Sequence, residues 1–141
     1  MRDRINLGKI IKFILVAVGI FIIGIAVFMF FRTRARAKDA LREAKNIYRA
    51  LYTIDVEYYA QGKTIYDHSK GDGLADGVKE DVDRLADAEG KYIVTSYNAR
   101  KREVTGMQYR NGHYLVTYTK KDGHEIWTVD YSMRLYRLTD E

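Results

Sequence analysis

The 141-residue sequence contains no cysteine and no proline. Without cysteine the chain has no disulfide, no thiolate metal ligand and no cysteine nucleophile. Without proline, nothing forces a kink or a stop inside a long helix. Phenylalanine is absent after residue 31, whereas all twelve tyrosines and the single tryptophan come later. The chain therefore has two parts suited to two solvents, because phenyl rings favour hydrocarbon and a tyrosine hydroxyl favours a hydrogen-bonding surface.

Acidic residues are scarce at the start of the chain. Residues 1–12 carry four Lys or Arg and one Asp, and residues 32–38 carry four basic residues and no acidic one. Residues 39–141 carry 16 basic and 18 acidic residues, so the net charge of +5 comes from the N-terminal segment. We expect no nucleic-acid partner, because such a partner requires positive charge on the folded domain. Contact with lipid headgroups explains the two basic clusters better.

Between these clusters lies an uncharged run, residues 13–31. As a helix it would rise about 28 Å, close to the ~30 Å hydrocarbon thickness of a bilayer. It is longer than the apolar region of about 7–15 residues in a secretory signal peptide, and it ends in Phe-Met-Phe-Phe-Arg rather than in small residues. The run predicts a retained transmembrane helix. The basic residues on its two sides are equal in number, so they do not indicate which end faces the cytoplasm. One face is expected to make membrane or assembly contacts: Phe13, Val16, Ile20, Ile23, Val27 and Phe31.

The helical pattern continues into residues 32–62. Apolar residues recur every three or four positions up to Tyr58, and Gly62 is the first strong stop. We expect one continuous helix from about Lys9 to Gln61. In its outer half, one apolar face is expected to pack on a sheet: Leu41, Ala44, Tyr48, Leu51 and Tyr58.

Residues 63–90 predict a loop and a short acidic helix. Asp72 is the expected N-cap, Gly90 the expected end, and the apolar stripe is Leu74, Val78, Val82, Leu85 and Ala86. The acidic residues lack the spacing of a calcium-binding EF-hand loop. They indicate a solvated helix face.

From residue 91 to residue 141 the apolar pattern has period two and predicts an antiparallel sheet. Residues 92–99 form one expected strand, and residues 102–132 form three more, joined at Asn111-Gly112 and at residues 121–123. Residues 133–138 are a candidate edge segment. The predicted fold class is α+β, a long helix packed on a four-stranded antiparallel meander.

The sequence offers little for catalysis. None of the three histidines, His68, His113 and His124, has metal-ligand spacing with another histidine or a carboxylate. Neither a nucleophile elbow nor a Gly-rich phosphate loop is present. We therefore expect no catalytic residue, no cofactor and no metal, and a protein that is not an enzyme.

These features together resemble those of type IV pilins and type II secretion pseudopilins. They are a short basic leader ending in Gly8, an apolar segment that runs into the amphipathic stretch "AKDALREAKNIYRAL", a variable loop and a C-terminal antiparallel sheet. Residues 92–130 are also similar to the sheet of pilin-like proteins from Gram-positive anaerobes. The resemblance implies a bacterial single-pass membrane protein whose sheet lies outside the cytoplasm. It also implies that the apolar helices pack together in the core of a surface filament.

The family's prepilin peptidase cuts after the leader glycine, so the resemblance implies cleavage between Gly8 and Lys9. The first mature residue is usually apolar or aromatic and the fifth is usually Glu, whereas this chain has Lys9 and Phe13 there. The resemblance therefore implies a minor or divergent subunit, whose partners are the membrane, copies of itself or other pilin-like subunits, and the peptidase.

A second hypothesis stays open beside this one. The chain could be a single-pass, membrane-anchored binding module outside the cytoplasm that does not polymerise. The two hypotheses differ in assembly and in whether the mature chain begins at Lys9.

Overall fold

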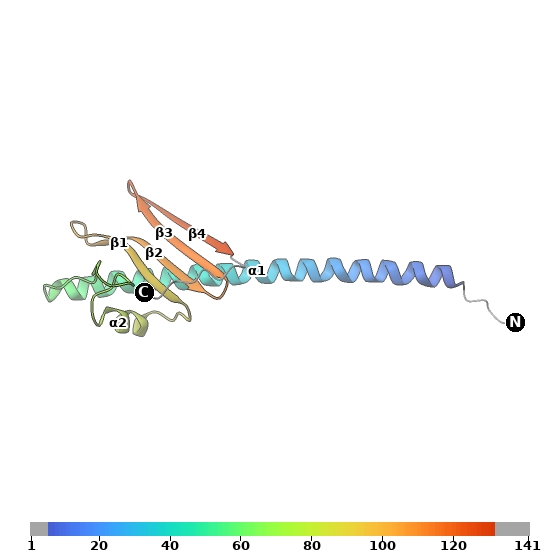
Figure 1. Cartoon of the computed structure of the whole chain (residues 1–141), viewed down its shortest axis with the longest axis horizontal. Coiled ribbons are helices and arrows are strands. Elements are labelled where there is room, and N and C mark those ends of the chain that lie inside the picture. Colours follow the sequence, from blue (N-terminus) through green and yellow to red (C-terminus); the bar gives the residue numbers. More distant parts are fainter. Residues whose placement is uncertain (1–5, 132–141) are drawn as a thin grey trace. The chain divides into compact units, whose positions relative to one another are not determined.

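The computed structural model describes residues 6–131 and has an α+β fold, with one long helix and a four-stranded antiparallel sheet (Figure 1). The helices are α1 (Leu7–Ala60) and α2 (Val78–Leu85). The strands are β1 (Lys91–Asn98), β2 (Glu103–Asn111), β3 (Tyr114–Lys121) and β4 (His124–Tyr131). The chain divides into two compact units at residues 36 and 37. We call the described part of the second unit, residues 37–131, the head.

Helix α1 is continuous over 54 residues, which confirms the helix expected from about Lys9 to Gln61. It ends where Gly62 adopts the left-handed conformation with φ of 71°, which costs glycine nothing because it has no Cβ. The backbone N–H groups of Gly62 and Lys63 then donate to the carbonyls of Tyr59 and Tyr58 at 2.9 and 2.8 Å. These bonds satisfy carbonyls that the last turn would otherwise leave without a partner.

Helix α2 begins later than expected, and Asp72 does not cap it. The N-cap is Gly77. The Asp72 side chain instead accepts a hydrogen bond from the Leu74 N–H at 3.1 Å, and its carbonyl accepts one from the Val94 N–H at 2.8 Å. Asp72 therefore holds a turn beside β1. The helix also ends before Gly90, and Leu85 is exposed rather than part of the apolar stripe.

The sheet is a meander in the order β1-β2-β3-β4, as the sequence predicts. The β3–β4 turn uses Asp122 and Gly123, both with positive φ, which is the requirement of a type I′ hairpin. The β2–β3 turn is shifted by one residue from the prediction. Asn111 pairs with Tyr114, so the two loop residues are Gly112 and His113 rather than Asn111 and Gly112. Residues 133–138 lie outside the described residues.

The alternation along β2 changes phase at Gly106. Val104 and Met107 are both buried although three positions separate them, and the β1–β2 register shifts beside Ser96. A Cβ on Gly106 would lie 2.4 Å from the Thr95 hydroxyl oxygen and 2.5 Å from that of Ser96. The irregularity depends on this glycine, which lets the two strands approach closely.

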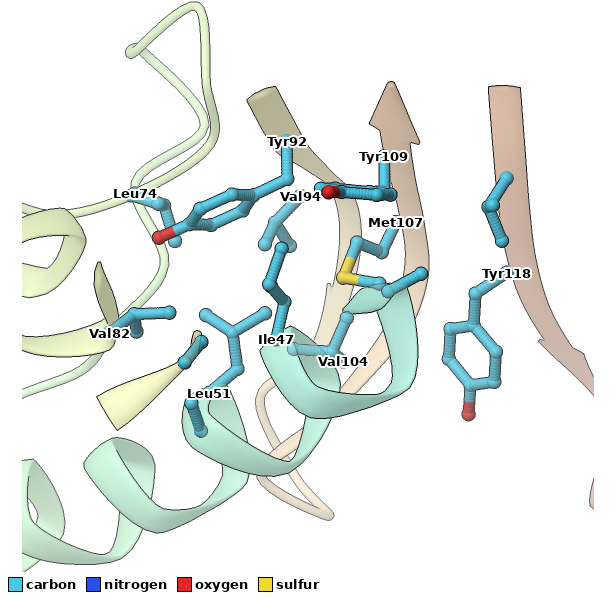
Figure 2. Close-up of a cluster of buried hydrophobic side chains, with 14 of the residues drawn as sticks. Ile47, Leu51, Leu74, Val82, Tyr92, Val94, Val104, Met107, Tyr109 and Tyr118 are labelled. Carbon is cyan, nitrogen blue, oxygen red and sulfur yellow. The ribbon is translucent and has the colours of Figure 1, made fainter. Parts of the chain in front are cut away.

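The core of the head lies between α1, α2 and one face of the sheet (Figure 2). Ile47 and Leu51 project from α1 toward Val94, Val104 and Met107 on the sheet. Leu74 and Val82 close the side nearer α2. The core contains four buried tyrosines, Tyr92, Tyr109, Tyr114 and Tyr118. Buried tyrosine hydroxyl groups usually have hydrogen-bond partners, so a core rich in tyrosine also contains polar contacts.

Candidate membrane segment and polar contacts of the head

The first unit contains the apolar part of α1, residues 13–31. Its most apolar 18-residue window has a mean hydropathy of 3.0, and none of that window is buried. The helix is thus long and apolar enough to cross a membrane, by length and composition. Residues 13–31 carry fifteen large apolar side chains. Removing each of them from water would gain about 1.5–3 kcal/mol. The segment therefore needs a bilayer or other apolar helices around it.

The six residues expected to form one contact face are all exposed, from 49% for Val27 to 78% for Phe13. Residues elsewhere on the same segment are equally exposed, for example Leu15 at 65% and Phe21 at 70%. The proposed face is therefore a hypothesis about partners, because the residues that the structure describes cover no side of this segment.

The Gly8–Lys9 bond, which the resemblance marks for cleavage, lies in the first turn of α1. The Asn6 carbonyl accepts hydrogen bonds from the N–H groups of Lys9 at 2.7 Å and Ile10 at 3.3 Å. The bond between Gly8 and Lys9 therefore lies inside a hydrogen-bonded helical turn.

The five residues expected to pack on the sheet all lie in or against the core. Ala44 and Leu51 are fully buried, and Leu41, Tyr48 and Tyr58 are half-buried against the core cluster. The Tyr58 hydroxyl also donates to an Asp81 carboxylate oxygen on α2 at 3.1 Å. Burial and this carboxylate raise the pKa of Tyr58.

Sequence reasoning missed the one buried charged residue of the described chain, Asp55, which is 4% exposed. Its carboxylate pairs with Arg102 at 2.6 Å and accepts a hydrogen bond from the Tyr97 hydroxyl at 2.9 Å. The Arg102 guanidinium also donates to the carbonyls of Asp55 and Lys63 and lies over the Tyr59 ring. This cluster ties the end of α1 to the β1–β2 turn.

Its only sequence signal was weak: an aspartate on the otherwise apolar face next to Ile54. The partner could not be found, because Arg102 is 47 residues away in a turn and has a positive φ of 50°.

A second polar contact joins α1 to β2. The Tyr109 hydroxyl donates to the Glu43 carboxylate, and the Asn111 side-chain amide donates to the same oxygen at 2.9 Å. The Tyr109 hydroxyl accepts in turn from the Gly90 N–H at 2.9 Å. Burial and the Glu43 carboxylate raise the pKa of Tyr109 above its usual range. The contact satisfies a buried hydroxyl and is structural.

Aromatic rings form a third contact, between α1 and strands β3 and β4. The Tyr118 ring lies 4.5 Å from the Trp127 ring and 4.7 Å from the Tyr48 ring. The Lys45 ammonium group lies 5.7 Å from the centre of the Trp127 ring. Trp127 is the single tryptophan, so tryptophan fluorescence reports on the surroundings of this one ring and changes when the head unfolds.

The head shows no constellation for catalysis among the described residues. His68, His113 and His124 are all exposed in loops or beside turns, and no group of three potential metal ligands occurs in residues 6–131. A cavity of about 30 Å³ on the outer sheet face, beside Ile93, Gln108 and Leu115, has room for about one water molecule. A larger open depression beside Glu89, Lys91 and Arg110 brings no nucleophile and base together.

Comparison with known proteins adds no identification: the chain matches no protein-family model, no curated protein and no solved structure. The function must therefore be argued from the chain's own residues.

Proposed function

We propose that the protein is a pilin-like, non-enzymatic structural subunit that spans the membrane once and assembles through residues 13–31. The observation that carries the proposal is the single unbroken helix α1. Its first half is apolar and entirely uncovered, while its second half supplies the core of the head. One continuous helix therefore joins a segment that requires apolar partners to a folded domain.

The packing of the head supports a structural role for α1. Seven α1 residues between Ala40 and Asp55 are buried, and polar contacts at Glu43 and Asp55 fix the helix to the sheet at two separate places. These two contacts oppose sliding of the helix along the sheet.

The second candidate is a membrane-anchored binding module that does not polymerise, and one feature favours it. Lys9 and Phe13 occupy the positions at which a pilin usually has an apolar residue and a glutamate. In an assembly, no acidic side chain in this segment would pair with a neighbour's new N-terminus. A monomeric anchor needs no such pair.

Fractionation of cells that make the protein, followed by N-terminal sequencing, separates the two candidates. The pilin-like proposal predicts the chain in sheared filament fractions visible by electron microscopy, with Lys9 as the first residue. A chain confined to the membrane, with Met1 intact, would refute assembly and favour the anchored module. A chain released by alkaline extraction from membranes would refute both.

A further inference from the structure

The inference concerns Arg32, Arg34 and Arg36, which we call the arginine ring. It rests on the proposal that residues 13–31 span a membrane. All three side chains are exposed on α1 directly after that segment. No acidic residue occurs between Asp3 and Asp39, so the segment itself offers these three charges no counter-charge.

The three arginines lie on two opposite sides of the helix rather than in one stripe. At 3.6 residues per turn, Arg34 lies about 200° around the helix axis from Arg32. Arg36 lies only about 40° from Arg32, on the same side. The side chains between them are small: Ala35, and Thr33, whose hydroxyl donates back to the Met29 carbonyl at 2.8 Å. A single protein surface cannot contact both sides of a helix at once. Whatever neutralises all three charges must therefore reach both sides of the helix.

The partner must also be amphiphilic. Phe28, Phe30 and Phe31 lie within about one turn of the ring and are 62–64% exposed. A nucleic acid or a soluble acidic protein would cover the arginines but leave these rings in water. A phospholipid leaflet presents phosphate groups directly beside its hydrocarbon and does so on every side of the helix.

We infer that the arginine ring binds the headgroups of anionic phospholipids in the leaflet on the head side of the membrane. A guanidinium group can bind a phosphate with two parallel hydrogen bonds. A zwitterionic lipid carries no net charge, so an anionic lipid neutralises the ring better. The ring then holds the apolar segment at a fixed depth in the bilayer.

Spin-labelled lipids test the inference on the full-length chain in phosphatidylcholine vesicles. Labelled phosphatidylglycerol and labelled phosphatidylcholine are each added in trace amount, and their relative association with the protein is measured by electron spin resonance. Phosphatidylglycerol is expected to be preferred severalfold at low salt, up to about fivefold for each arginine. The preference should fall as salt screens the charges.

The variants are matched in charge. The triple Arg32→Gln, Arg34→Gln, Arg36→Gln variant is expected to lose most of the preference, and the corresponding triple lysine variant to keep most of it. The control removes three exposed head lysines instead, as Lys79→Gln, Lys101→Gln, Lys121→Gln, and should keep the preference of the original chain.

Three outcomes would overturn the inference. The first is equal association of the two lipids with an inserted chain. The second is an equal loss in the ring and head-lysine variants. The third is no preference for either lipid, together with chemical cross-linking between copies of the chain that is lost when the three arginines are replaced. That result would assign the arginine ring to contacts between copies. Failure of the chain to resist alkaline extraction from the vesicles would overturn the proposed function as well, so the two failures are distinguishable.

Discussion

The Asp55–Arg102 pair allows the most specific prediction about the head. The Asp55 side chain is 6% exposed and the Arg102 side chain 28%, so this ion pair is largely removed from water. Removing one partner of a fully buried pair costs about 3–5 kcal/mol, because the other charge stays buried alone. Arg102→Met leaves the Asp55 carboxylate with only the Tyr97 hydroxyl, and it should lower the free energy of unfolding by about 3–4 kcal/mol.

Asp55→Asn should cost less, about 2–3 kcal/mol, because the partly exposed Arg102 keeps two backbone carbonyls as acceptors. The double variant should cost about as much as Arg102→Met alone, so the coupling energy should equal the cost of Asp55→Asn, about 2–3 kcal/mol. Methionine is the appropriate substitution at residue 102, because it retains the backbone cost of the positive φ while removing the charge.

Urea unfolding of the full chain in detergent micelles, followed by the fluorescence of Trp127, measures these free energies. The control is Asp39→Asn, which breaks an exposed pair with Arg42 at 3.3 Å and should cost less than about 1 kcal/mol. Additive effects of Asp55→Asn and Arg102→Met would refute the reasoning. So would single-variant losses no larger than that of the control.

Three further predictions concern other contacts of the head. Gly90→Ala should cost about 1–3 kcal/mol in the same unfolding assay, because its Cβ would lie 2.2 Å from the Arg110 carbonyl oxygen. The control is Gly71→Ala, which should be nearly neutral because a Cβ there has no neighbour within 4 Å. Equal losses of stability in the two variants would contradict this reasoning. Glu43→Gln should cost about 1 kcal/mol by replacing charge-assisted hydrogen bonds with neutral ones, and a loss below about 0.3 kcal/mol would contradict this. Burial and the Asp55 carboxylate raise the pKa of Tyr97 to about 12, so the stability it contributes is complete below pH 10, its ordinary pKa, and is lost as the pH rises toward 12. Urea midpoints between pH 9 and pH 12 should therefore fall less steeply in Tyr97→Phe, and an unchanged slope would contradict this.

The long helix and the meander could be predicted because their signals are local. Apolar residues recur at helical spacing up to Tyr58, and period-two strands are separated by turn residues such as Asp122-Gly123. Both patterns arise within one element and need no knowledge of its neighbours. The same holds for the apolar segment, which length and composition alone define.

The errors arose where a residue's role depends on a distant part of the chain. Asp72 has the chemistry of an N-cap, but its carbonyl is engaged by the Val94 N–H of β1, which fixes it in a turn ahead of α2. The β2–β3 turn shifted by one residue because Asn111 is held in the ladder opposite Tyr114 and bonds to Glu43 on α1. The buried pair at Asp55 was missed for the same reason, since 47 residues separate its members.

Disulfide cross-linking along residues 13–31 tests most directly whether this segment assembles with like helices. The chain has no cysteine, so each single-cysteine variant reports one position without background. The account predicts cross-linked dimers in membranes with helical periodicity, strongest on the face of Val16, Ile20, Ile23 and Val27. Positions on the opposite side, Ile14, Val18 and Ile25, should give little product. No cross-link at any position, or equal yields all around the helix, would contradict assembly through this segment.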